Sequence, residues 1–369
     1  MGFFDSIADR LGGKKDITGQ HIQLKVCMMG PRAVGKTTIL TSIFHDSDKK
    51  LVESGLYFKA VGATESTLNK GYEQLSNIFD HITDESATPL PGVDATKSVT
   101  TFDFQLGLKG QGTQDKRSSV DINITDFPGE FMDENHPEHQ KVTDYIRESQ
   151  VIMVAIDTVH LMEEDGIYNE ARNRSEYLCK KMVKQLNDLP ETERKLILLV
   201  PLKCEKYAIE QRLDEVDKCV KIAYATLIGE IEKELFNRRM GLFITPIQTL
   251  GGVVFDCFGR DESNNVIIDP TDNCPHEVRY RFHRVIPGHK PMYMPAFCIQ
   301  PLYYLVTFAL NQYKYQKDQG GIFSTMLKGV FGLFSSDLKF YQACMNFVSN
   351  IKLDGHGFQV LNNPNFVQK

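Results

Sequence analysis

Residues 22–44 read Ile22-Gln-Leu-Lys-Val-Cys-Met-Met-Gly30-Pro-Arg-Ala-Val-Gly35-Lys36-Thr37-Thr-Ile-Leu-Thr-Ser-Ile-Phe44. The first eight residues form a compact apolar run that ends at Gly30-Pro31, which is typical of a buried parallel strand. The segment from Thr37 to Phe44 has the composition of a helix. The stretch therefore predicts a buried strand, a glycine-containing loop and a helix in immediate succession.

The loop between this strand and helix matches the pattern GxxxxGK[ST], and its strand–loop–helix context is the one in which that pattern binds phosphate. Two glycines allow the backbone N–H groups to curl inward around phosphate oxygens, and the helix N-terminus adds its dipole. Lys36 would reach the β- and γ-phosphates, and the Thr37 hydroxyl would be a ligand of Mg²⁺. We predict a nucleotide-phosphate site formed by Gly30, Ala33, Val34, Gly35, Lys36, Thr37 and Thr38.

Strand and helix patterns alternate outward from this motif. Further strands are predicted at 56–61, 101–108, 119–124, 151–156, 196–200 and 242–247, and helices at 65–82, 169–189, 214–236 and 301–315. The strands at 101–108 and 119–124 form a hairpin pattern. Such alternation predicts an α/β fold, a doubly wound and mostly parallel P-loop sheet with helices on both faces.

The chain divides by pattern into three parts. Residues 1–20 form an amphipathic segment, which either docks on the domain or anchors it to a membrane surface or a partner. Residues 21–318 form the P-loop domain, with insertions at 47–98 and 252–295, the latter containing a strand-like piece at 278–285. Residues 319–369 form a C-terminal helical extension. Its apolar stretch at 321–334 covers the domain or forms a docking surface.

Composition narrows the class of protein. Of 369 residues, 41% are hydrophobic and 24% charged, which excludes a wholly disordered, collagenous or coiled-coil chain. The net charge of −6 gives no reason to expect nucleic-acid binding. Eight scattered cysteines without a CxxC pair indicate reduced thiols, and no apolar run reaches the ~18 residues of a membrane span. We therefore expect a cytoplasmic protein.

A second motif, Asp126-Phe-Pro-Gly129-Glu130, follows the strand at 119–124. An Asp at the tip of a neighbouring strand can hold magnesium through water. Gly129 frees an N–H that can contact a γ-phosphate, so this loop can sense whether that phosphate is present. The alternative is an ordinary Pro-Gly turn.

These two motifs resemble those of the P-loop GTPases of the Ras-like, translation-factor-related class. The resemblance implies that Asp126–Gly129 is switch II and that Thr96 or Thr100 is the switch I threonine. Where these proteins commonly have a Gln that orients water, this chain has Glu130, whose charge adds repulsion near a γ-phosphate. The implied catalytic residues are Lys36 and Glu130, and the implied Mg²⁺ ligands are Thr37, Asp126 and Thr100.

The base-contacting motif departs from this class, whose usual run is Asn-Lys-x-Asp. Here Leu202-Lys203-Cys204-Glu205 follows the strand at 196–200. Lys203 would stack its stem on guanine, and Glu205 could accept from the base N1–H and N2–H₂, whereas Leu202 loses a polar contact. Gln248, after the last core strand, occupies the place of the final base-contacting loop.

The resemblance implies a molecular switch that binds GTP or GDP with Mg²⁺, hydrolyses GTP slowly and responds to a protein effector or activator. The insertions and the C-terminal region look like elaborations of bacterial GTPases of the double-GTPase type. Two alternatives are a nucleotide-binding scaffold without turnover, suggested by Glu130, and an ATP-using NTPase or kinase, suggested by Leu202.

Four more residues carry alternative interpretations. Arg32 either approaches the transition-state charge or is a solvated loop residue. His136 and His139, on a polar loop after switch II, indicate a solvated segment more than a metal site. Asp157 ends a buried strand, where catalytic side chains are common in α/β sheets, or caps the next element.

Overall fold

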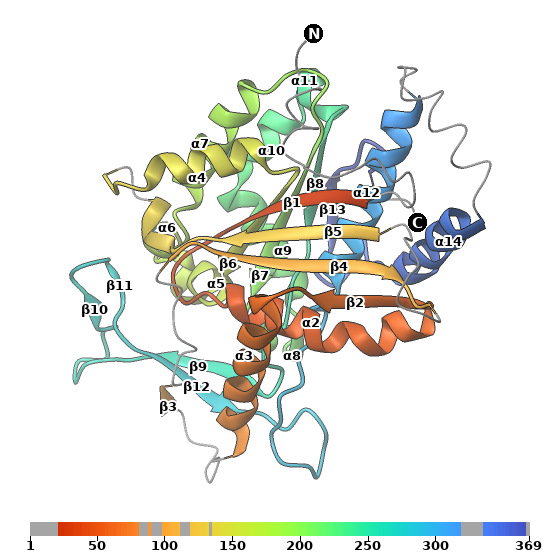
Figure 1. Cartoon of the computed structure of the whole chain (residues 1–369). Helices are drawn as coiled ribbons and strands as arrows, with labels where there is room; N and C mark the ends of the chain where they lie inside the picture. Colours follow the sequence, from red (N-terminus) through yellow and green to blue (C-terminus); the bar gives the residue numbers. More distant parts are fainter. Residues whose placement is uncertain are drawn as a thin grey trace.

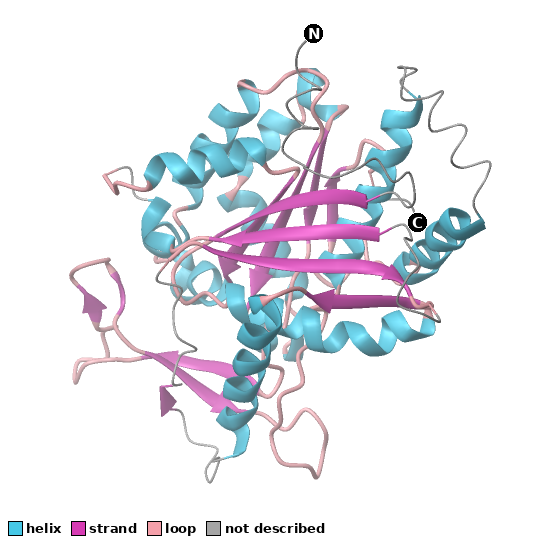
Figure 2. Cartoon of the chain, in the orientation of Figure 1, coloured by secondary structure: helices cyan, strands magenta, loops and turns pink. Residues whose placement is uncertain are grey.

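The computed structural model describes residues 21–80, 88–89, 98–110, 119–132, 135–318 and 335–366. Its centre is a large sheet whose described strands follow the order β13-β8-β7-β6-β1-β5-β4-β2 (Figure 1). The five middle strands are parallel: β1 (His21–Met29), β5 (Ser119–Asp126), β6 (Val151–Asp157), β7 (Lys195–Leu202) and β8 (Met240–Ile244). Helices flank both faces of this sheet (Figure 2). The fold is the predicted doubly wound α/β architecture.

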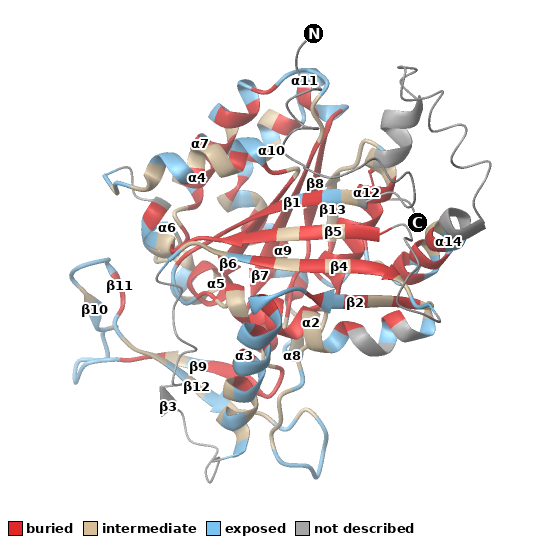
Figure 3. Ribbon diagram, in the orientation of Figure 1, coloured by how far each residue is buried: buried red, intermediate tan, exposed pale blue. Residues whose placement is uncertain are grey.

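Strands β6, β7 and β8 are buried on both faces, which explains why they appear in the sequence as nearly continuous hydrophobic runs. In β6, Met153 and Ala155 belong to one core cluster, and Ile152, Val154 and Ile156 belong to the other. These buried strands form the centre of the molecule in Figure 3. Each face of the sheet therefore requires its own helical layer.

Two groups of helices cover the two faces. The first core cluster includes side chains of α2 (Lys36–Glu53), α12 (Gln300–Asp318) and α14 (Ser335–Val348). The second includes side chains of α4 (His139–Glu148), α7 (Ser175–Asn187), α9 (Leu213–Ala223) and α10 (Ala225–Ile231). Shorter helices complete the layers, namely α5 (Thr158–Met162), α6 (Asn169–Asn173), α8 (Glu205–Ile209) and α11 (Glu234–Asn237).

Antiparallel strands extend the sheet at one edge. The predicted hairpin is present, because β4 (Thr100–Leu108) pairs antiparallel with β5. Beyond it, β2 (Leu56–Ala60) pairs antiparallel with β4 and ends the sheet. The next helix, α3 (Ala63–Asp80), packs on α2, where a Cβ on Gly71 would lie 2.9 Å from Thr41 Oγ1.

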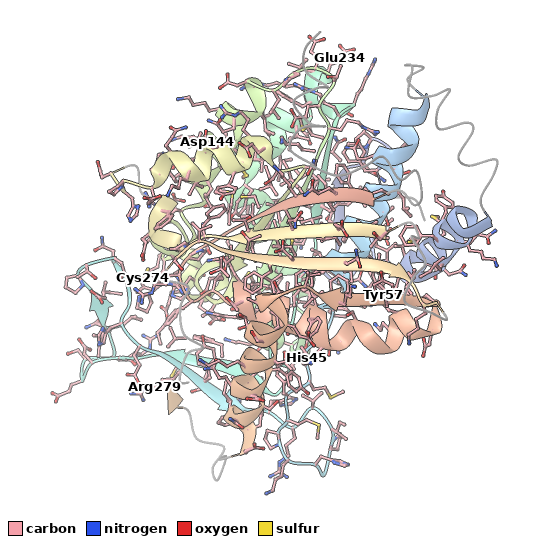
Figure 4. All side chains as sticks on the ribbon, in the orientation of Figure 1. His45, Tyr57, Asp144, Glu234, Cys274 and Arg279 are labelled. Carbon is pink, nitrogen blue, oxygen red and sulfur yellow. The ribbon has the colours of Figure 1, made fainter. Side chains whose placement is uncertain are left out.

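The two predicted insertions meet in a small second sheet. Its strands are β9 (Val253–Phe258), β12 (Val278–Phe282) and β3 (Thr88–Pro89), in the order β3-β12-β9. A two-stranded hairpin, β10 (Ile268–Asp269) with β11 (Cys274–Pro275), extends from it. Figure 4 shows Cys274 and Arg279 on this outlying part of the molecule, away from the central sheet. The segment before β4 is thus tied to the 252–295 insertion through β3.

The region after residue 319 contains a helix, α14, and also a strand that the sequence did not predict. β13 (Gln359–Asn362) pairs antiparallel with β8 and ends the central sheet opposite β2. The side chain of Phe366 then packs on Phe308, with ring centroids 5.0 Å apart. The apolar stretch 321–334 and the segment 1–20 lie outside the described residues.

Several predicted helices differ in their limits. The first helix extends to Glu53 instead of ending at Phe44. The single helix predicted at 169–189 is broken at Arg174, whose φ of 51° is left-handed. The helix predicted at 214–236 is divided into α9, α10 and α11, and Lys233 between the last two is extended. Side-chain periodicity continues across such breaks, so it does not reveal them.

Candidate nucleotide-binding site

The predicted phosphate loop lies at the carboxyl end of β1, between β5 and β6, and leads into α2. Gly30 has φ = 146°, and a Cβ there would lie 2.6 Å from the Ala155 carbonyl oxygen on β6. Only glycine satisfies both conditions. On the inner side of the loop, the nearest atoms to a Cβ on Gly35 would be in Leu202 and Thr249, at 3.7 and 3.8 Å. The loop therefore packs against the two segments that were predicted to contact a base.

The Lys36 side chain lies within the phosphate loop. It is 5% exposed, and its Nζ donates to the carbonyls of Gly30 at 3.1 Å and Pro31 at 3.2 Å. Asp126 Oδ1 lies 3.6 Å from the same nitrogen. Burial lowers the pKa of Lys36, and Asp126 opposes that shift. A cation held at the concave side of a loop is suitably placed for a phosphate.

Thr37 and Asp126 come together although 89 positions separate them in the sequence. The Thr37 hydroxyl donates to Asp126 Oδ2 at 3.4 Å, and Asp126 is fully buried at the end of β5. A hydroxyl and a carboxylate side by side, next to a phosphate loop, are the hard oxygen donors that Mg²⁺ prefers. Among the described residues there is no group of three or more His, Cys, Asp or Glu side chains that could hold a metal by themselves. The donor set fits a Mg²⁺ ion that is also held by phosphate oxygens.

The segment predicted to be switch II lies directly against the phosphate loop. A Cβ on Gly129 would lie 2.5 Å from the Arg32 backbone nitrogen and 3.0 Å from the Pro31 carbonyl carbon. The segment then forms a short 3₁₀ turn over Gly129–Met132, in which Glu130 is exposed and Phe131 stacks on His136 at 4.5 Å. Gly129 is therefore in close contact with the phosphate loop, and its role as a γ-phosphate sensor stays a prediction.

Of the two threonines predicted for switch I, the structure describes Thr100. It begins β4 and is the register partner of Asp126 on β5, and its hydroxyl donates to the Ser98 carbonyl at 3.3 Å. Thr96 lies outside the described residues. Thr100 therefore lies near the predicted Mg²⁺ ligands, and its role as a ligand stays a prediction.

The Lys203 side chain forms an ion pair with a carboxylate at the end of the neighbouring strand. Its Nζ lies 2.8 Å from Asp157 Oδ2, and its backbone is left-handed with φ = 62°. Burial alone would raise the pKa of Asp157, but Lys203, His160 and Arg172 together hold that pKa well below its ordinary value. The pairing raises the pKa of Lys203 against the opposing effect of its burial. Stacking of the Lys203 stem on a base stays a prediction.

The Glu205 carboxylate is hydrogen-bonded within the protein. Its side chain is 3% exposed, and Oε1 accepts from the backbone N–H groups of Leu250 at 2.7 Å and Gly251 at 3.2 Å. The Thr249 hydroxyl donates to the same oxygen at 3.3 Å. Burial raises the pKa of Glu205, and these hydrogen bonds oppose the shift. The carboxylate thus fastens the 249–251 loop, a role that the sequence did not suggest, and its predicted contact with guanine remains untested.

Gln248 belongs to the same loop. Its backbone exchanges two hydrogen bonds with Ala296, at 3.1 and 2.9 Å, in an isolated bridge. Leu202, which stands where the related class has Asn, is buried against Gly35. The loops predicted to contact a base are therefore held by apolar contact and backbone pairing, and the base contact of Gln248 stays a prediction.

Two residues in this region escaped the sequence analysis. Arg172, on α6, donates through an Nη atom to the Arg32 carbonyl at 2.8 Å, and its Nε lies 3.4 Å from Asp157 Oδ2. Asn173 accepts from the Asp157 N–H at 2.8 Å and donates to the Asp157 carbonyl at 3.1 Å. The sequence feature that could have indicated these two residues is the polar run Asn-Glu-Ala-Arg-Asn of α6. A reversal of the chain separates this run from Asp157, so the sequence alone does not show that they meet.

Asp157 also fulfils the capping role that was one of its two interpretations. Its side chain accepts from the His160 N–H at the start of α5, and His160 Nδ1 lies 3.0 Å from Oδ1. The Arg32 side chain is exposed. His139 contacts Lys181, with Nζ 3.0 Å from Nε2, and His136 stacks on Phe131. Neither histidine belongs to a metal-binding group among the described residues.

All eight cysteines carry free thiols, and Cys27 and Cys204 are buried in the core. Burial raises the pKa of both thiols. Within the described ranges, no helix has the length and apolar character to cross a membrane.

The comparison with solved structures gives matches of low identity and low TM-score. Era, in complex with MgGDPNP and nucleotides 1506–1542 of 16S ribosomal RNA, matches with 13% identity and a TM-score of 0.31, covering 79% of this chain and 67% of Era. The Ski7 GTPase-like domain of S. cerevisiae matches in its GDP-and-phosphate form with 11% identity and a TM-score of 0.33, covering 67% of this chain and 46% of that one. Its GTP-bound form matches with 10% identity and a TM-score of 0.32, covering 68% and 45%. This chain thus spans less than half of either Ski7 chain.

No curated protein sequence matches the chain significantly. The model of the family described as Double-GTPase 2 matches residues 25–241, which include the phosphate loop, the predicted switch II and the run after β7 that was predicted to contact a base. That match spans more than half of the 369 residues. The chain therefore belongs to the Double-GTPase 2 family.

Proposed function

We propose that this protein is a guanine-nucleotide switch that binds GTP with Mg²⁺ and hydrolyses it slowly to GDP and phosphate. One observation carries the proposal: Lys36, Thr37 and Asp126 meet at the carboxyl end of β1 and β5. Gly129 touches the same loop. Family membership supports guanine nucleotide as the ligand.

Each residue would have a distinct task in hydrolysis. Lys36 and the loop N–H groups would bind the β- and γ-phosphates and oppose the charge that develops as water attacks the γ-phosphate in line. Thr37, Asp126 and Thr100 would hold Mg²⁺, which supplies further charge neutralisation when bound. Gly129 would sense the γ-phosphate, so that its loss after hydrolysis releases the switch segments and alters a surface read by a protein effector.

The proposed rate is slow because the water-positioning place holds a carboxylate. Glu130 is exposed on the 3₁₀ turn after Gly129. A negative side chain near a γ-phosphate raises the energy of the attacking arrangement, although it can still accept a proton from water. We expect a protein activator to accelerate GTP hydrolysis.

A binding module without turnover is the second candidate, and Glu130 is the observation that favours it. Single-turnover phosphate release separates the two: purified protein loaded with γ-labelled GTP and Mg²⁺ should release phosphate faster than buffer and faster than the Lys36→Ala variant. Phosphate release no faster than in buffer would reject hydrolysis and favour the binding module without turnover.

Base preference is tested separately, because Leu202 removes a polar contact and Glu205 is occupied by the 249–251 loop. A fluorescent guanine nucleotide bound to the protein should be displaced by GTP and GDP at much lower concentration than by ATP. Displacement by ATP at equal or lower concentration would show that the site does not prefer guanine nucleotides, and it would overturn the guanine assignment. The mass of nucleotide released from the purified protein by heat gives an independent answer.

A further inference from the structure

Arg172 connects the phosphate loop to the middle of the sheet. One Nη atom donates to the Arg32 carbonyl at 2.8 Å, and Nε lies 3.4 Å from Asp157 Oδ2. The two arginines are 140 positions apart in the sequence, so only the fold brings them together. The Arg172 side chain is 20% exposed; its contact with Asp157 is partly buried, whereas its hydrogen bond to the Arg32 carbonyl is exposed to solvent.

The helix that carries Arg172 is fixed in place. Asn173, the next residue, is 1% exposed and exchanges two hydrogen bonds with the Asp157 backbone, at 2.8 and 3.1 Å. Asn169 also donates to Ser175, and Ser175 donates to Glu170, so side chains of α6 are bound to the first residue of α7. The α6 backbone therefore holds Arg172 at the level of the phosphate loop.

The Arg32 residue is held from two sides. Its carbonyl accepts from Arg172, and its N–H lies against Gly129 of switch II, where an added Cβ would be only 2.5 Å from the nitrogen. A carbonyl that is bound by a cation cannot turn toward a phosphate oxygen, which it would repel. The contact therefore favours the loop conformation in which N–H groups are available to an anion.

Charge in this cluster also favours an anion. Asp157 contributes one negative charge, while Lys203 and Arg172 contribute two positive charges within 3.4 Å of it. Arg172 further lowers the pKa of Lys36, although burial is the larger cause of that shift.

We propose that Arg172 is a positioning residue for nucleotide binding: it holds the Arg32 carbonyl away from the phosphates and keeps the phosphate loop in its binding conformation. The proposal rests on the proposed function, since it concerns the same site. Arg172 is anchored by Asp157, so the two residues should act as one unit.

The test uses the full chain and compares Arg172→Ala, Arg172→Lys and Arg172→Gln. Dissociation constants for fluorescent GDP and GTP are measured with Mg²⁺. A hydrogen bond from a charged donor is typically strong enough for a roughly tenfold effect on affinity. We expect Arg172→Ala to weaken both nucleotides about tenfold, Arg172→Lys to restore most of the loss, and Arg172→Gln to restore part of it.

Arg147→Ala is the matched control, because Arg147 is an exposed arginine paired with Asp144 on α4. It should bind both nucleotides like the wild type. The ³¹P resonance of the β-phosphate of bound GDP provides a readout of loop geometry, and it should shift in Arg172→Ala but not in Arg147→Ala.

The outcomes separate the inference from the function on which it rests. If the wild type binds no nucleotide, the proposed function fails. If the wild type binds, Lys36→Ala does not and Arg172→Ala equals the wild type, the function stands and the positioning role is overturned. A loss in Arg172→Ala that comes with a lower melting temperature, no ³¹P shift and no rescue by lysine also overturns it, because Arg172 would then only support the fold.

Discussion

Lys203 Nζ lies 2.8 Å from Asp157 Oδ2, and this ion pair joins the ends of two adjacent parallel strands, β7 and β6. Asp157 is fully buried and also contacts His160 and Arg172, so one carboxylate holds the helix after β6, the phosphate loop and the segment after β7. The predicted phosphate-contacting and base-contacting segments are thus linked through a residue that contacts neither ligand in our proposal.

Asp157→Asn should therefore destabilise the protein. Removing one partner of a buried ion pair typically costs about 3–5 kcal/mol. Lys203 and Arg172 are each about one-fifth exposed, so we expect the lower end of that range. Chemical denaturation of both proteins at pH 7 measures the difference in the free energy of unfolding. A difference below ~1 kcal/mol would contradict the stabilising role of the Asp157 ion pairs.

The same pair predicts a pH dependence. The pKa of Asp157 in the folded protein is well below its ordinary value of 3.8, so its ionised form is stabilised by folding. That stabilisation is complete above the unfolded pKa and is lost as pH falls toward the folded value. The wild type should keep its advantage over Asp157→Asn from pH 7 to about pH 4, and the difference in unfolding free energy should shrink only below that. Shrinkage already between pH 7 and 5 would contradict the depressed pKa.

Lys36→Ala should abolish nucleotide binding without unfolding the protein. Each hydrogen bond from a charged group contributes about 1.5–3 kcal/mol, and Lys36 would reach two phosphates, so affinity should fall at least ~100-fold. Titration with fluorescent GTP measures it, and circular dichroism verifies folding. Lys25→Ala, at an exposed position on the same strand–loop unit, is the control and should bind normally. Micromolar affinity retained by Lys36→Ala would exclude the predicted role.

Gly129→Ala should separate switch II from the phosphate loop. The new methyl group would lie 2.5 Å from the Arg32 nitrogen, and because its nearest neighbours are all backbone atoms of the phosphate loop, no flexible side chain can move aside. We expect faster hydrogen exchange in residues 129–132 and weaker GTP binding. Gly229→Ala on α10 is the control, since nothing lies within 4 Å of its added Cβ, and it should be neutral or slightly stabilising. Equal exchange in both variants would contradict close contact between switch II and the loop.

Glu130→Gln should increase the single-turnover rate of GTP hydrolysis. The exposed side chain makes the change harmless to the fold, and removing a negative charge near the γ-phosphate lowers the barrier by about 1 kcal/mol, which corresponds to roughly fivefold. Phosphate release under identical loading measures the effect. A slower Glu130→Gln would show that the carboxylate acts as a base, and the direction of our prediction would be wrong.

Phe366→Ala should destabilise the whole domain although it lies beyond the family match. Phe366 is fully buried between Phe308 and the guanidinium of Arg194, whose central carbon lies 4.2 Å from the ring centroid. Removing a buried phenyl ring costs about 3–5 kcal/mol. Thermal or chemical unfolding measures the change, with Leu235→Ala, at a half-exposed leucine, as the near-neutral control. A loss below ~1 kcal/mol would indicate that the last segment is dispensable.

The fold could largely be predicted because its signals are local. Apolar residues on both faces make β1, β6 and β7 visible as continuous runs, and the phosphate loop marks the point where β1 becomes α2. β13 escaped prediction because its four residues are only partly buried and follow no alternation. β13 forms by pairing with β8, which lies more than a hundred positions earlier in the chain. The local sequence pattern around β13 contains no information about that partner.

The site was predictable only where function requires particular residue types in sequence order. Lys36 and Thr37 follow from the loop motif, and Asp126 follows from the strand that precedes it. Arg172 was invisible because the chain reverses between β6 and α6, where Glu164 and Asp165 have positive φ values of 49° and 53°. Contacts made by such a reversal depend on the whole fold, so a list of motifs cannot include them.

The late position of β13 has a consequence for biosynthesis. Roughly a third of the chain separates β8 from the strand that covers its open edge. At ~5–20 residues per second, the ribosome needs on the order of ten seconds to make that interval, during which β8 has no partner on one side. An uncovered strand is a template for association between nascent chains. Overexpression yield should therefore improve with chaperone supply or slower growth at low temperature, whereas truncation before β13 should direct the product to inclusion bodies.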